Sequence, residues 1–222
     1  MASVIFDLDG TLADTSGDLI AAANACFTGL GLGALLDPKE DAGTALRGGR
    51  AMLKLGFSRV EGFDEDEIDR QYPILLDAYG ANIDAHTVLY DGAMEAVEAL
   101  KSKGFFVGIC TNKPEALAQT LLERLGIRDA FGSLVGADTL AVRKPDPEPL
   151  FEAVRRAGGD PARCCLIGDS DTDRNTARAA GVPSVLVTFG PSGEDMAALE
   201  PEALINHFDE LPDVAARLLR LD

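Results

Sequence analysis

The stretch Val4-Ile5-Phe6-Asp7-Leu8-Asp9-Gly10-Thr11-Leu12 indicates the fold class. It begins with a continuous apolar run, which is typical of a buried strand in a parallel sheet, and it then passes directly into two aspartates. In open α/β sheets, ligands bind just outside the carboxyl ends of the strands. Because neighbouring carboxylates repel each other, a divalent cation is their simplest partner, and oxygen ligands suit Mg²⁺. The alternative is a solvated Asp-Gly turn at a strand end.

The composition is that of a globular protein. The chain has 222 residues, of which 46% are hydrophobic and 26% charged, so it can form one large domain or a domain with an insert. The net charge of −17 argues against nucleic acid and anionic membranes as partners. We find no long apolar run that would span a membrane and no basic segment typical of a signal peptide, so we expect a cytoplasmic protein. Monomer and homodimer both remain open.

The cysteines and histidines do not form a recognisable site. Cys26 lies in a predicted helix, and Cys110, Cys164 and Cys165 lie in apolar, strand-like runs. Their spacing fits neither a C-x-x-C motif nor a zinc site, so we expect buried free thiols. The chain has 2 histidines, and neither stands in a motif, which argues against a Ser-His-Asp triad.

The pattern along the chain predicts two domains. Residues 14–87 are helical in pattern throughout, whereas strands and helices alternate from about residue 92. The predicted strands are 105–110, 134–135, 164–167 and 184–187, and the predicted helices are 93–102, 114–125, 147–157, 172–180 and 211–221. The strand at 4–6 must join this second block, because a parallel strand needs neighbours. We therefore expect an α/β core domain of residues 1–13 and 88–222, with a helical domain of residues 14–87 inserted into it.

Two features predict helix boundaries inside the insert. Asp37-Pro38-Lys39-Glu40 combines an N-cap residue, a proline at the first helical position and an acid at the third, which predicts a helix start. The run 64–78 is acidic at its start and apolar at intervals, which predicts a helix. Pro73 is expected to kink or end that helix, since proline lacks a backbone N–H.

Four segments with unusual polar residues come after predicted strands. They are Asp7-x-Asp9, Thr111-Asn112-Lys113, Arg143-Lys144-Pro145-Asp146-Pro147 and Gly168-Asp169-Ser170-Asp171-Thr172-Asp173. All four would meet at one edge of a parallel sheet. Together they supply carboxylates, a hydroxyl with backbone donors and a fixed cation, which are the parts needed for metal-assisted phosphoryl transfer.

Structural alternatives exist for several of these residues. Thr111 and Asn112 could cap the helix that follows them. Lys144 could be a surface lysine before a proline turn. Asp171 and Asp173 lie at a predicted helix start, where acids suit the helix dipole, and for Asp171 we favour that interpretation.

The four segments, in this order, resemble the motifs of the haloacid dehalogenase superfamily and, within it, the phosphoglycolate-phosphatase-like hydrolases. The resemblance covers essentially the whole chain. It implies a Rossmann-like parallel sheet core with an inserted α-helical cap domain, which here would be residues 14–87. It also implies a Mg²⁺ cofactor and a small phosphorylated substrate.

The resemblance implies a role for each motif residue. Asp7 would attack phosphorus and form an aspartyl-phosphate, and Asp9 would protonate the leaving oxygen and later activate water. Thr111 would bind a phosphoryl oxygen together with Asn112, and Lys144 would neutralise the phosphate and the Asp7 carboxylate. The metal site would consist of Asp7, the backbone carbonyl of Asp9, and Asp169. Asp173 would support these ligands without contacting the metal.

The choice within the family depends on Asp9 and on the insert. The acid at position 9 favours phosphate-ester chemistry, and the Gly-Asp-x-x-x-Asp spacing favours a hydrolase over a β-phosphoglucomutase. Arg47 and Arg50, which flank Gly48-Gly49, could bind a substrate carboxylate or could be solvated helix charges. The predicted reaction is hydrolysis of a small phosphate monoester, foremost 2-phosphoglycolate. The alternatives are a phosphoglucomutase-like transfer, a pyrophosphatase, a sugar or nucleotide phosphatase, and a catalytically silent binding relative.

Overall fold

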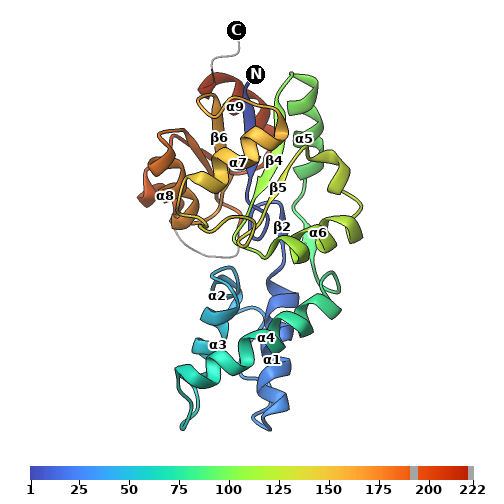
Figure 1. Ribbon diagram of the computed structural model, residues 1–222, viewed down its shortest axis with the longest axis vertical. Coiled ribbons are helices and arrows are strands. Elements are labelled where there is room, and N and C mark those ends of the chain that lie inside the picture. The colour runs from blue at the N-terminus through green and yellow to red at the C-terminus, as the bar shows by residue number, and fades with distance from the viewer. Residues whose placement is uncertain (191–194, 220–222) are drawn as a thin grey trace. The chain divides into compact units, whose positions relative to one another are not determined.

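Contacts divide the protein into two units, which are drawn in Figure 1. The computed structural model describes residues 1–190 and 195–219. We call the first unit, made of Met1–Ala13, Leu89–Gly190 and residues 195–219, the core unit. The second unit, Asp14–Val88, is called the helical unit. Each unit is described by itself below.

The core unit contains a parallel sheet whose strand order is β5-β4-β1-β6-β7-β8. These strands are β1 (Ser3–Phe6), β4 (Phe106–Cys110), β5 (Leu134–Val135), β6 (Cys164–Gly168), β7 (Ser184–Val187) and β8 (Ala203–Ile205). β1 lies between β4 and β6, and Ile5 pairs in register with Gly108 on one side and with Leu166 on the other. All of β1 is buried, which explains why Val4, Ile5 and Phe6 are apolar without alternation.

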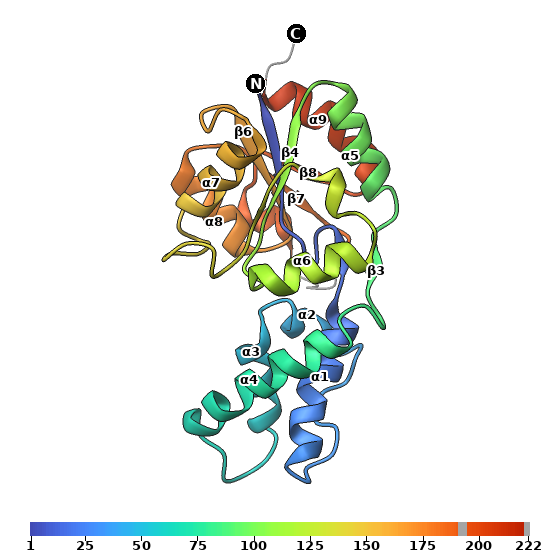
Figure 2. The same cartoon turned by 45° about the vertical axis from the view of Figure 1, so that its right-hand side comes forward.

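Helices cover both faces of this sheet. α7 (Glu148–Ala157) and α8 (Asp171–Ala180) cover one face, while α5 (Ala93–Ser102) and α9 (Leu211–Leu218) pack together on the other, as Figure 1 and Figure 2 show. The remaining core helices are α6 (Glu115–Arg124) and the short 3₁₀ turns η1 (Arg128–Ala130), η2 (Met196–Leu199) and η3 (Phe208–Glu210). The predicted α/β fold class with a parallel sheet is confirmed. The edge strand β8 was not predicted, because its three residues carry little pattern.

The helical unit is built from α1 (Ser16–Gly29), α2 (Ala42–Ala45), α3 (Gly49–Phe57) and α4 (Glu65–Ala81). α4 packs on both α1 and α3. The buried side chains of the helical unit include Phe27, Met52, Leu75 and Tyr79. Two short strands, β2 (Ala13–Asp14) and β3 (Val88–Leu89), pair with each other where the chain passes from one unit to the other.

Pro73 was expected to kink or to end its helix, and the second of these outcomes is wrong, as is the predicted helix start at Pro38. α4 continues to Ala81, because Leu75 and Tyr79 beyond the proline are buried and hold the helix in place. No helix starts at Pro38. The Asp37 carboxylate accepts hydrogen bonds from the N–H groups of Lys39 and Glu40, as an N-cap would, but only a turn follows.

Two further expectations concern the whole chain. The four cysteines are free and buried, as predicted, and burial raises the pKa of the Cys110 thiol to about 12. Among the described residues, no helix combines the length and the apolar character that a membrane span requires.

Candidate active site

Three of the polar segments meet at the switch point of the sheet. β1 is followed by Asp7, and its two neighbours β4 and β6 are followed by Thr111 and by Asp169. The chain connects strands in opposite directions on the two sides of β1, and ligands of α/β proteins bind at such points. The loop that carries Lys144 brings the remaining segment, residues 143–147, to the same place, since Lys144 contacts Asp7.

Lys144 is the cation at the centre of this site. Its side chain is only 1% exposed, and its Nζ lies 2.9 Å from Asp7 Oδ2 and 2.7 Å from Asp173 Oδ1. Burial acts to lower the pKa of Lys144, but the carboxylates of Asp173 and Asp7 outweigh burial and raise that pKa above its usual value. Lys144 is therefore a fixed positive charge, and its interpretation as a surface lysine is wrong.

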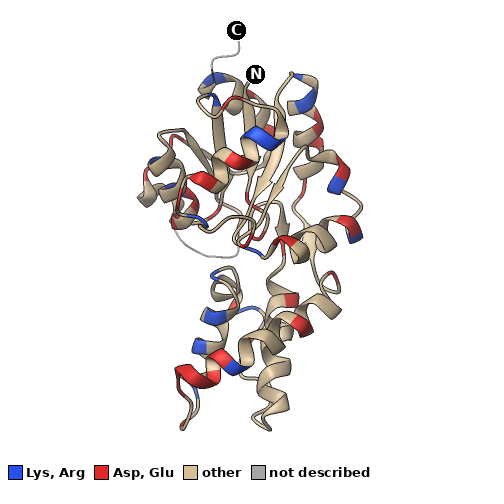
Figure 3. Ribbon diagram, viewed as in Figure 1, with Lys and Arg blue, Asp and Glu red and all other residues tan. Residues whose placement is uncertain are grey.

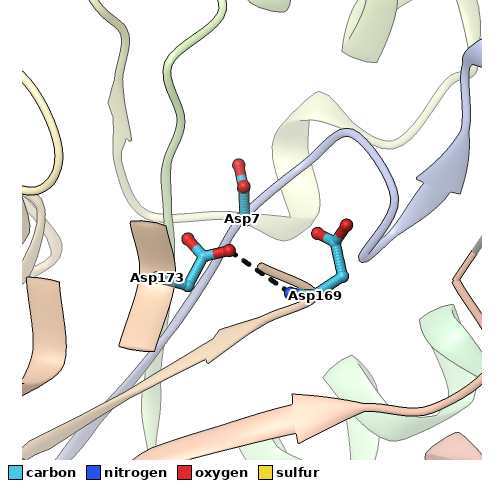
Figure 4. Close-up of side chains that lie close together, drawn as sticks. All are labelled: Asp7, Asp169 and Asp173. Carbon is cyan, nitrogen blue, oxygen red and sulfur yellow. Dashed lines mark hydrogen bonds between the residues drawn. The ribbon is translucent and has the colours of Figure 1, made fainter. Parts of the chain in front are cut away.

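Asp7, Asp169 and Asp173 form a carboxylate cluster, drawn in Figure 4. One carboxylate oxygen from each lies within 4.8 Å of the others. Burial, together with the charges of Asp173 and Asp9, raises the pKa of Asp7 to about 6 against the opposing effect of Lys144. Burial, Asp173 and Asp7 likewise raise the pKa of Asp169 well above its usual value. The cluster therefore holds more negative charge than Lys144 neutralises, and its hard oxygen donors suit a divalent cation.

Asp173 is completely buried, whereas the Asp7 side chain is 13% exposed, and both Asp173 oxygens have protein partners. Oδ1 receives Lys144, and Oδ2 accepts hydrogen bonds from Ser170 Oγ at 2.6 Å and from the Asp169 N–H at 3.3 Å, the dashed line of Figure 4. Asp173 is thus suited to orient Lys144 and Asp169. The Ser170 side chain in turn caps α8, since it accepts a hydrogen bond from the Asp173 N–H.

Thr11 orients Asp169 from the first segment. Its buried hydroxyl donates a 2.7 Å hydrogen bond to Asp169 Oδ1. The sequence analysis assigned no role to Thr11, although it follows the Asp-x-Asp pair within two residues. The signal was its polar side chain in an otherwise apolar and glycine setting. The contact spans 158 residues of sequence, so no local pattern reports it.

The segment after β4 carries three side chains with different surroundings. Thr111 is buried, and its Oγ1 accepts a 3.2 Å hydrogen bond from the Lys113 N–H. Asn112 Nδ2 donates a 3.0 Å hydrogen bond to the Lys144 carbonyl, so it ties two polar segments together. Neither caps α6, whose N-cap is Pro114 without a side-chain hydrogen bond, so the capping alternative is wrong.

Lys113 is a second buried cation that the sequence analysis did not single out. Its side chain is 4% exposed, and its Nζ lies 2.9 Å from Asp9 Oδ1. The two aspartates of the first segment are therefore each paired with a lysine: Asp7 with Lys144 and Asp9 with Lys113. The lysine after Thr111-Asn112 was visible in the sequence, but only the fold brings it to Asp9.

The predicted substrate-binding arginines belong to the helical unit. Arg47 and Arg50 are both exposed. Arg50 forms an ion pair with Asp69 of α4, and its guanidinium lies 5.7 Å from the centre of the Tyr72 ring. A role for Arg47 and Arg50 in substrate binding stays a prediction.

Comparison with known proteins identifies the family. The family model of the haloacid dehalogenase-like hydrolases matches residues 1–181. The chain belongs to this family. A phosphoglycolate phosphatase of Mesorhizobium japonicum is 40% identical over 98% of this chain and 96% of its own length. A phosphoglycolate phosphatase of Agrobacterium fabrum is 39% identical over 93% and 89%.

A solved structure supports the same assignment. The crystal structure of a predicted phosphoglycolate phosphatase from Haemophilus somnus superimposes with a TM-score of 0.85 at 25% identity, and the match covers 96% of this chain and 97% of that one. The family resemblance inferred from the four segments is therefore confirmed, as is the prediction that this haloacid dehalogenase-like hydrolase is an enzyme.

Proposed function

We propose that this hydrolase is a Mg²⁺-dependent phosphatase that releases phosphate from 2-phosphoglycolate through an aspartyl-phosphate on Asp7. The observation that carries the proposal is the buried cluster at the switch point. There Asp7 contacts Lys144 and lies close to two further carboxylates, and Asp9, which is paired with Lys113, follows two residues later. This combination of nucleophile, proton carrier and fixed cation suits phosphoryl transfer.

The donor set suits Mg²⁺. Asp7 and Asp169 would hold the ion, with the backbone carbonyl of Asp9 as the predicted third ligand. Asp173, which is completely buried and bonded to Lys144 and Ser170, would support them without contacting the ion. When bound, Mg²⁺ would neutralise charge on the phosphoryl oxygens and on the two carboxylates. The excess negative charge of the cluster, expressed in the raised pKa values of Asp7 and Asp169, is the reason to expect it.

In the first half of the reaction, a carboxylate oxygen of Asp7 attacks phosphorus while the bond from phosphorus to the substrate oxygen breaks. Asp9 donates its proton to that leaving oxygen, so glycolate leaves with its hydroxyl restored. A carboxylate is a weak nucleophile, so orientation contributes much of the rate. Lys144 contacts Asp7 at 2.9 Å and would hold this carboxylate in place, and the Thr111 hydroxyl would donate to a phosphoryl oxygen.

In the second half, Asp9 accepts a proton from a water molecule as that water attacks phosphorus. The bond from phosphorus to Asp7 then breaks, which frees inorganic phosphate and regenerates the Asp7 carboxylate. Water must therefore reach the site after the leaving group has departed. We propose that the helical unit, residues 14–87 in the predicted division, acts as a cap that opens between the two halves.

The substrate is proposed from the relatives. Those named phosphoglycolate phosphatase match nearly the whole length of this chain at 36–40% identity. A small ester with two anionic groups also agrees with buried lysines beside both aspartates. The cytoplasmic location, the absence of nucleic-acid and membrane partners, and a monomeric or homodimeric state stay predictions.

The test measures phosphate release from a panel of phosphate esters, with Mg²⁺ and with a chelator, on the wild type and on Asp7→Asn. We expect release that requires Mg²⁺, that the variant lacks and that is fastest with 2-phosphoglycolate. Turnover of 2-phosphoglycolate no faster than that of an aryl phosphate would overturn the substrate assignment. Interconversion of glucose phosphate isomers without release would indicate a mutase, and complete inactivity would indicate a binding protein.

A further inference from the structure

The site contains a cation for which the proposed reaction has no use. Lys144 contacts Asp7, the carboxylate that would attack phosphorus. Lys113 lies beside Asp9, with its Nζ 2.9 Å from the carboxylate that would protonate the leaving oxygen. Groups that adjoin Asp9 are therefore near the leaving group rather than the phosphoryl group.

We propose that Lys113 binds the carboxylate of the substrate's leaving group and so selects acidic phosphate esters. The inference rests on the proposed function, and it names the residue that would distinguish 2-phosphoglycolate from neutral esters. In 2-phosphoglycolate a single methylene separates the carboxylate carbon from the oxygen that Asp9 protonates. A cation in contact with Asp9 is thus within reach of that carboxylate.

The backbone of Lys113 is held at both ends. Its N–H donates to Thr111 Oγ1 at 3.2 Å, and its carbonyl accepts a 2.9 Å hydrogen bond from the Ala137 N–H. The side chain therefore emerges from a fixed position, which limits the loss of conformational entropy when an anion binds. The same loop carries Thr111, which we assign to the phosphoryl oxygens, so one rigid segment would contact both ends of the substrate.

The cost of burying Lys113 argues for a function beyond stability. Removing an ammonium and a carboxylate from water costs several kcal/mol per ion, and apolar side chains in place of a buried pair are often as stable. A 4% exposed lysine paired with Asp9 is therefore weak evidence for a structural role.

The helical unit offers the competing assignment. From the sequence, Arg47 and Arg50 could either bind a substrate carboxylate or be solvated helix charges. The Arg50 guanidinium is already paired with Asp69 and lies over Tyr72, and its side chain is 51% exposed. Lys113 is by contrast buried within the core site itself. The two assignments predict different variants with altered specificity, so one experiment separates them.

The experiment compares two substrates on one carbon framework. 2-Phosphoglycolate carries a carboxylate where 2-hydroxyethyl phosphate carries a neutral hydroxymethyl group. The ratio of their kcat/KM values is measured with saturating Mg²⁺ for the wild type, Lys113→Met, Lys113→Arg and Arg50→Met. Because both substrates are tested on the same preparation, the ratio does not depend on the fraction of enzyme that is folded.

We expect Lys113→Met to reduce the preference for 2-phosphoglycolate by about 10- to 100-fold, the range for a hydrogen bond to a charged group. Lys113→Arg should keep most of the preference, because it keeps the charge. If Lys113→Met does not fold, Lys113→Gln is the second neutral variant, and it can still donate a hydrogen bond to Asp9.

Three results would overturn the proposal. Equal losses on both substrates would mean that Lys113 acts through Asp9 or through the fold. A preference that persists in Lys113→Met and disappears in Arg50→Met would assign the carboxylate to the helical unit, while leaving the proposed function intact. A wild type without preference for 2-phosphoglycolate would overturn both this inference and the proposed substrate.

Discussion

Buried carboxylates in the two units have opposite surroundings. In the helical unit, Asp18 is 3% exposed and accepts hydrogen bonds from the N–H groups of His86 and Thr87 and from the Thr87 hydroxyl, at 2.8 to 3.0 Å. In the core unit, Asp7 and Asp169 face other carboxylates, and the pKa values of both are raised. Neutral donors that satisfy a carboxylate stabilise a fold, whereas carboxylates left in excess indicate a site that awaits a cation.

The ion pairs of the helical unit also differ from the charged groups of the core site. Figure 3 marks charged residues along α3 and α4, where Lys54 pairs with Glu65 and Arg70 with Glu67. In the first pair both side chains are mostly exposed, and such pairs contribute little to stability. The helical unit therefore keeps most of its paired charge in water, while the core unit buries charge at the switch point.

The largest expected effect is that of Asp7→Asn on turnover. Loss of the nucleophile should lower kcat by at least about 10³-fold, because no other group would accept the phosphoryl group. The matched control is Asp171→Asn, the same change at an exposed position at the start of α8. It should leave kcat within about twofold of the wild type, and an equal loss in both variants would refute the assignment of Asp7.

The same variant also tests the stability side of the comparison. In the absence of metal, Asp7→Asn should not lower the free energy of unfolding, since burial already disfavours the ionised carboxylate and raises its pKa to about 6. Urea unfolding with a chelator present measures this. A marked loss of stability would mean that the cluster is structural and would break the contrast with Asp18.

Asp18→Asn should show the reverse pattern. The amide would turn an NH₂ group toward backbone N–H donors of His86 and Thr87, so we expect a loss of about 2–3 kcal/mol of stability. Urea unfolding gives the size of the loss. Turnover measured well below the unfolding midpoint should change far less than in Asp7→Asn, and a comparable loss of turnover would give Asp18 a part in the reaction.

A pair of glycines tests packing in the helical unit. A Cβ on Gly56 would lie 2.1 Å from the Phe27 ring, so Gly56→Ala should cost about 1–3 kcal/mol through overpacking. A Cβ on Gly29, at the end of α1, meets nothing within 4 Å, so Gly29→Ala should add about 0.5–1 kcal/mol. Thermal unfolding of both variants measures the two signs. Stabilisation by both substitutions would show that the Phe27 ring adapts.

The effect expected of Asp41→Asn is also small, and it depends on pH. Hydrogen bonds from Arg59 to both carboxylate oxygens hold the pKa of Asp41 below its usual value. A lowered pKa in the folded state means stability that is present above the unfolded pKa of about 3.9 and lost as the pH falls through the folded pKa. We expect a cost of about 1 kcal/mol at pH 7 that disappears in strong acid. Urea unfolding at both pH values measures it, and a cost that persists in acid would exclude the ion pair as its source.

The prediction of the sheet succeeded where the pattern was local. β1, β4, β6 and β7 were predicted within one residue at each end, because their side chains are apolar and glycine or polar residues bound them. The prediction that the helix could end at Pro73 was wrong because it also used only local sequence. The local rule that proline ends a helix is correct for an isolated chain, but the burial of Leu75 and Tyr79 outweighs it here.

In the candidate site, local sequence likewise predicted some features and missed others. Its carboxylates and Lys144 could be predicted because they directly follow strands or lie in recognisable segments. The partners of these groups could not be predicted, since Thr11 and Asp169 are 158 residues apart and Lys144 and Asp173 are 29 apart. Lys113 belongs to the same class, because nothing near it in sequence indicates that it pairs with Asp9.

The sequence by itself determined the α/β class, the apolar central strand, the insertion of a helical segment and the chemical groups that follow the strands. These depend on periodicity and residue type, which act over a few residues. Only the tertiary structure decided which lysine meets which aspartate, which carboxylates come together and which charge is buried. Those outcomes depend on the order of strands across the sheet and on removal from water, because both are properties of the folded chain rather than of any short segment.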